Sequence, residues 1–125
     1  MVAETQAPDR RSIRLEARLF VIQRLSALVL APLVLTHIVL ILYAVEGGLT
    51  AAEILSRTQG SLGWALFYGV FVLAASVHAA IGLRTILREW TRAEGRMLDT
   101  AMAAVSVALI LTGLRGVYAV TWGGA

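Results

Sequence analysis

The feature that most constrains this chain is a set of three long apolar segments. They cover residues 19–45, 62–87 and 98–122. Residues 25–45 and 62–83 contain no Asp, Glu, Lys or Arg, and a helix needs about 20 apolar residues to cross the hydrocarbon core. The chain is 58% apolar and 15% charged, more apolar than a soluble domain of 125 residues can bury. We therefore expect an all-α integral membrane protein with three transmembrane helices in one domain, residues 1–125.

The segments around these spans carry their own local signals. Residues 12–20 have an apolar side and predict a short helix at the membrane interface. Pro32 lies inside the first span and predicts a bend, because proline cannot donate a helical hydrogen bond. In the polar connection that follows, Thr50 and Glu53 have the spacing of a capping box, which predicts a short surface helix over residues 50–57.

The arginines predict how the chain is oriented in the membrane. Five of them lie at the start of the chain, at positions 10, 11, 14, 18 and 24. Four lie between the second and third spans, at positions 84, 88, 92 and 96, and Arg57 alone lies between the first and second spans. The positive-inside rule then puts the N-terminus in the cytoplasm of a multi-pass protein of the cell inner (plasma) membrane. The arginines flank spans, so we expect contact with membrane lipid and none with nucleic acid. Arg84 to Arg96 recur every four residues, which predicts one basic stripe on a continuous helix.

Three polar residues inside the spans are the first candidates for function: His37, His78 and Arg115. The chain has no Cys, which excludes disulfides, thiolate zinc, iron–sulfur ligation and covalent haem attachment within it. Neutral imidazole is a common axial ligand of haem iron, and helical bundles hold haem between histidines on facing helices. Both histidines are therefore candidate metal ligands, and the alternative is a histidine that only makes hydrogen bonds.

The depths of the two histidines argue against one shared iron. His78 lies six residues before Arg84, about 9 Å from that boundary, whereas His37 lies 13 residues after Arg24, about 20 Å from it. Trans ligands of one iron are only about 4 Å apart. We therefore expect half of a haem-binding helical bundle, in which each histidine pairs with one from another chain. Arg84 and Arg115 are candidate partners for haem propionates, and the alternatives are a flanking arginine and one that extends to the membrane surface.

These residues resemble a known family. The segment His78-Ala-Ala-Ile-Gly82-Leu-Arg84 resembles the His-x-x-x-Gly-x-Arg haem-ligand motif in the membrane anchor (cytochrome b) subunits of succinate dehydrogenase and fumarate reductase, respiratory complex II. Gln23-Arg24-Leu25-Ser26 resembles the His-Arg-x-Ser-Gly signature of the larger anchor, and residues 116–123 are similar to the end of the smaller one. The resemblance covers the whole three-span layout.

The resemblance implies roles for individual residues. His78 matches the axial ligand of the haem nearer the cytoplasm, and His37 matches the first-span histidine of two-haem members. Arg24 and Ser26 fall at a quinone site, and Trp90 stands where the smaller anchor has a quinone-binding tyrosine. The implied cofactors are one haem b or two, shared with a partner anchor, and a quinone.

The resemblance also implies partners and a role. A flavoprotein subunit interconverts succinate and fumarate, an iron–sulfur subunit relays electrons, and a second membrane anchor, either a different subunit or a second copy, completes the haem site. This chain would be a non-catalytic subunit of the oxidoreductase. One alternative is a haem b subunit of another respiratory complex, against which three spans count. Another is a haem-free transporter or assembly subunit with an ion path through His37, His78 and Arg115.

Overall fold

The computed structural model describes residue 7 and residues 9–123. Four helices make up this part of the chain: α1 (Arg10–Glu46), α2 (Ala51–Thr58), α3 (Leu62–Thr91) and α4 (Arg96–Thr121). Helices α1, α3 and α4 are each long and apolar enough to cross a membrane, and the described residues include no strand. The prediction of an all-α membrane protein with three spans is therefore confirmed.

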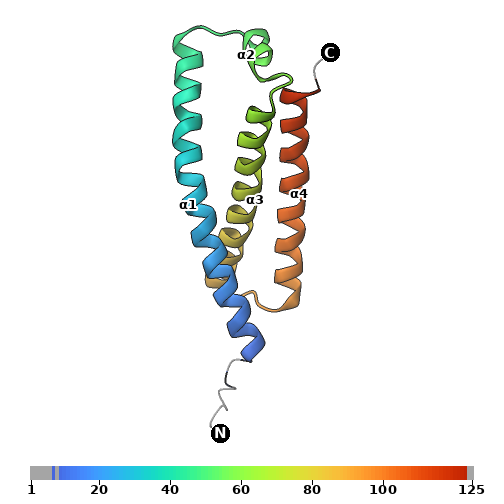
Figure 1. Ribbon diagram of the computed structural model, residues 1–125. Helices are drawn as coiled ribbons and strands as arrows, with labels where there is room; N and C mark the ends of the chain where they lie inside the picture. Colours follow the sequence, from blue (N-terminus) through green and yellow to red (C-terminus); the bar gives the residue numbers. More distant parts are fainter. Residues whose placement is uncertain (1–6, 8, 124–125) are drawn as a thin grey trace.

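Helix α3 lies between α1 and α4 and packs against both (Figure 1). The start of α1 and the α3–α4 turn lie at one end of the bundle, which we call the Arg-rich end because it carries Arg10–Arg18 and Arg84–Arg96. Helix α2 and the end of α4 lie at the opposite end, called the α2 end below. The two arginine groups of the sequence thus gather on the same side of the bundle.

One narrow seam of α1 faces α3. The seam residues alternate in steps of three and four, the spacing that keeps one stripe of a helix against a neighbour. They are Glu16, Leu19, Gln23, Ser26, Leu30, Leu33, His37, Leu40 and Ala44. All the remaining residues of α1 are exposed. Leu28 and Val45, for example, are 72% and 71% exposed. Such an apolar circumference fits contact with lipid or with another membrane helix.

Two expectations about helix boundaries were wrong. Residues 12–20 do not form a separate interfacial helix, because they are part of the continuous helix α1. The basic stripe is also interrupted: α3 ends at Thr91, and Arg92 takes a left-handed conformation with φ of 56°. Gly95, with φ of 93°, completes the reversal before α4. Only Arg84 and Arg88 therefore share the stripe, since a left-handed residue ends the helical repeat.

Helix α1 runs through Pro32 without a break, and Thr36 Oγ1 donates a hydrogen bond to the Pro32 carbonyl. The blue and cyan halves of α1 are inclined to each other in Figure 1, in agreement with the expected bend.

The short helix α2 begins as predicted. The Thr50 side chain accepts from the Glu53 N–H, and the Glu53 carboxylate accepts from the Thr50 N–H at 2.7 Å. Its other end is attached to α4, because Thr58 Oγ1 donates to the Val120 carbonyl at 2.7 Å and the Gly60 N–H donates to the Thr121 carbonyl at 2.7 Å. These bonds hold α2 across the end of the bundle.

Candidate functional site

The two histidines lie at different levels of the α1–α3 interface. His78 of α3 is 3.1 Å from Ser26 of α1, measured from Nδ1 to Oγ. His37 of α1 contacts Tyr68 and Phe71 of α3, with ring centroids 5.8 Å and 5.5 Å apart. Ser26 and His37 are 11 residues apart on one helix, about 16 Å along its axis. The separation in depth that the sequence predicted is therefore present, and no single iron fits between the two imidazoles.

The imidazole of His78 is half-buried, and its neighbour Ser26 is only 8% exposed. The Ser26 hydroxyl donates to the Gln23 carbonyl at 2.9 Å, so this serine makes one bond within α1 and one contact with α3. Ser26 was expected at a quinone site, and the structure places it against the imidazole of His78.

A groove of about 640 Å³ lies between α1 and α3 toward the Arg-rich end, and its lining does not include Ser26 or His78. Its lining comes from α1 and α3: Glu16, Leu19, Phe20, Gln23, Ile81, Gly82, Arg84, Thr85 and Ile86. The Oε1 atom of Gln23 is buried, and no hydrogen-bond partner for it lies among the described residues. A Cβ added at Gly82 would meet only the Gln23 amide nitrogen, at 3.4 Å. Gly82 therefore leaves part of the groove wall without a side chain.

Arg84 of α3 forms ion pairs with both neighbouring helices at the Arg-rich end. Its guanidinium donates to Glu16 of α1 through Nη2 at 2.7 Å, and to Asp99 of α4 through Nε at 2.8 Å. Arg88 adds a second ion pair to Glu16 at 2.8 Å. Arg84 was expected to meet haem propionates, a role that stays a prediction. No motif in the sequence marks Glu16 or Asp99, although an acidic residue in register with the α1 seam was a signal for Glu16.

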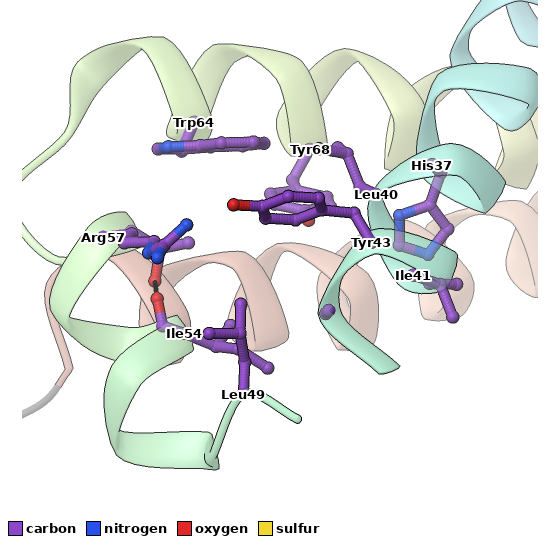
Figure 2. A pocket seen from close by; sticks show the side chains of 11 residues that line it. His37, Leu40, Ile41, Tyr43, Leu49, Ile54, Arg57, Trp64 and Tyr68 are labelled. Carbon is purple, nitrogen blue, oxygen red and sulfur yellow. Dashed lines mark hydrogen bonds between the residues drawn. The ribbon is translucent and has the colours of Figure 1, made fainter. Parts of the chain in front are cut away.

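At the α2 end a cavity of about 280 Å³ lies among α1, α2 and α3. Figure 2 shows His37 at one side of it and Arg57 of α2 at the other, with Tyr43 and Tyr68 between them. The Nδ1 atom of His37 is buried and makes no hydrogen bond with the described residues. Arg57 could not be predicted from the sequence, because only the position of α2 brings it to this cavity, and Tyr68 lies there because α3 packs against α1.

Arg115 is not part of this cavity. It is exposed, and its neighbours two residues away on either side, Gly113 and Val117, are the half-buried ones. Two residues correspond to about 200° around a helix, so Arg115 points away from α3. Arg115 was predicted to bind the propionates of an outer haem, and this role requires a haem that lies outside the three-helix bundle.

The three residues expected at a quinone site do not meet within the chain. Arg24 is exposed and lies over the Phe20 ring, 5.2 Å from its centroid, while Ser26 faces α3 on another side of the same helix. Trp90 is 83% exposed near the end of α3. Arg24 and Trp90 are thus open to another subunit, and Ser26 is not.

Within residues 9–123 no three side chains among His, Asp and Glu form a metal-binding group. The fold and the site together define a multi-pass helical membrane protein with an imidazole at each of two levels. A family model described as the succinate dehydrogenase/fumarate reductase transmembrane subunit matches residues 3–113. The chain belongs to this family. Searches of curated proteins and of solved structures found no match.

Proposed function

We propose that this chain anchors a succinate dehydrogenase or fumarate reductase complex in the membrane and binds haem b through His78. In this role it carries electrons between the iron–sulfur subunit and the quinone pool. The observation that carries the proposal is the half-buried imidazole of His78, which contacts Ser26 Oγ through Nδ1 and lies one helical turn from Gly82 in the wall of an open groove. A ligand imidazole in proteins is typically held through its second nitrogen in this way.

The residues around His78 fit a haem by one observation. Gly82 lies one turn from His78 and leaves space where a side chain would block a flat macrocycle. A bound haem b would supply a one-electron carrier within the membrane. In this role His78 would hold the iron through a ring nitrogen, and the apolar side chains of α1 and α3 would exclude water from the group.

The proposal includes partners outside this chain. The second axial histidine comes from another anchor, either a different subunit or a second copy, because His37 is at the wrong level. The flavoprotein and iron–sulfur subunits bind at the Arg-rich end, which we place in the cytoplasm at the plasma membrane. Arg24 and Trp90 are exposed at that end and are our candidates to complete a quinone site with those subunits.

His37 is the candidate ligand of an outer haem, with Arg115 as a partner for its propionates. The support is the position of His37 beside a cavity at the α2 end. An ion path through His37, His78 and Arg115 has less support, because the histidines are about three turns of α1 apart and Arg115 faces away from α3.

The experiment is a reduced-minus-oxidised spectrum of the purified complex and of its His78→Ala and His37→Leu variants. We expect a b-type spectrum from which His78→Ala removes the component of one haem and His37→Leu removes the component of the outer haem. A wild-type complex without haem would contradict the haem role. A spectrum unchanged by His78→Ala would show that another residue is the ligand. A spectrum unchanged by His37→Leu would contradict the proposal of an outer haem.

A further inference from the structure

The Ser26 hydroxyl contacts two polar atoms at once. Its Oγ lies 2.9 Å from the Gln23 carbonyl oxygen and 3.1 Å from His78 Nδ1. A serine hydroxyl has one proton to donate and two lone pairs that can accept. The proton can therefore point to only one of these two atoms, and the choice sets the protonation of the imidazole.

The Gln23 carbonyl carries no proton, so only the Ser26 hydroxyl can supply one to the contact between them. Two oxygens 2.9 Å apart attract each other only when a proton lies between them, so the Ser26 hydroxyl donates to the Gln23 carbonyl. The contact with His78 is then satisfied only if Nδ1 carries a proton and donates it to Oγ. In the opposite arrangement, two acceptors would face each other beside a serine that is 8% exposed.

A neutral imidazole has one ring proton, so Nε2 of His78 retains its lone pair. We propose that Ser26 is a positioning residue for His78: it fixes the Nδ1–H tautomer and the ring orientation that present Nε2 to the haem iron. This inference rests on the haem role proposed above. It also means that Ser26 has no proton left to donate to a quinone oxygen.

Accepting a hydrogen bond from Nδ1–H makes the imidazole a stronger electron donor to the metal. A stronger donor stabilises ferric haem more than ferrous haem, because the ferric iron carries the larger charge. Loss of the Ser26 oxygen should therefore shift the midpoint potential of this haem to more positive values. A residue that only filled space would not move the potential in this direction.

The test compares the complete wild-type complex with its Ser26→Ala, Ser26→Thr and Ser76→Ala variants. Ser26→Thr keeps a hydroxyl, and Ser76 is a second buried serine, two residues from His78 on another face of α3. The readouts are haem content, the midpoint potential from a redox titration, the electron paramagnetic resonance spectrum of the ferric haem, and the KM for quinone. We expect Ser26→Ala to shift the potential positively and to change the resonance spectrum, with KM unchanged. The Thr and Ser76 variants should resemble wild type.

Three results would overturn the assignment. The first is an unchanged potential and resonance spectrum in Ser26→Ala, and the second is equal loss of haem from the Ala and Thr variants, which indicates packing alone. The third is a raised KM for quinone with an unchanged potential, which would indicate that Ser26 binds quinone. A wild-type complex without haem would instead refute the proposed function itself.

Discussion

Arg84 and Glu16 form a bidentate ion pair between α3 and α1, with Nη2–Oε1 and Nη1–Oε2 distances of 2.7 Å and 3.3 Å. The two partners are in different environments, because the Arg84 side chain is 9% exposed and that of Glu16 is 43% exposed. The guanidinium depends on this pair more than the carboxylate does, since a buried charge without a partner is costly whereas an exposed one is solvated.

Removal of Glu16 should therefore weaken the Arg-rich end of the bundle. Glu16→Ala leaves Arg84 with Asp99 alone and removes the partner of Arg88, and we expect a loss of about 1–3 kcal/mol in stability. The measurement is thermal denaturation of the purified complex in detergent. Glu94→Ala, at an exposed acid of the α3–α4 turn, is the matched control. Equal stability of the two variants would show that the ion pairs add nothing.

The approach of α4 to α3 depends on Gly113. A Cβ at this position would lie 2.4 Å from Val72 Cγ1, so Gly113→Ala should force the helices apart and cost about 1–3 kcal/mol. Val72→Ala in the same chain should recover most of the loss by removing the opposing methyl groups. Gly116→Ala is the control, because its Cβ would meet nothing within 4 Å. Denaturation midpoints of the four complexes test this, and a Gly113→Ala variant as stable as the control would contradict it.

Helix α2 should become less stable at acidic pH. Hydrogen bonds from the Thr50 N–H and hydroxyl lower the pKa of Glu53 from its ordinary value. The folded pKa is then below the unfolded one, so this contribution to α2 is complete above the unfolded pKa and is lost as the pH falls through the folded pKa. The protection factors of the α2 amides, which are their exchange rates corrected for the intrinsic effect of pH, should fall in that acidic window. Glu53→Gln should remove the pH dependence, whereas Arg57→Gln should keep most of it.

Much of the fold could be predicted from local features of the sequence. The length of the apolar runs determines the three spans, and the Thr50–Glu53 spacing determines where α2 begins. The rise per residue of a helix was sufficient to separate the levels of His37 and His78. Each of these features depends on residues close together in the chain, which is why sequence alone was sufficient.

The partners across the bundle could not be predicted in the same way. Ser26 meets His78, and Arg84 meets Asp99, only because of the axial register and rotation of packed helices. Register depends on the sum of many side-chain contacts, so no motif encodes it. The direction of Arg115 was missed for the same reason: a position within a span gives depth, but not which side of the helix a side chain occupies.

The Ser26–His78 contact joins residues that are 52 positions apart in the chain. Ser26 therefore enters the membrane with α1, before the helix that carries its partner has been synthesised. Until α3 packs against α1, no serine oxygen is available to hold the ring of His78. If His78 binds haem as proposed, its imidazole is held ready for the metal only after these two helices have packed, and haem loading would follow that packing.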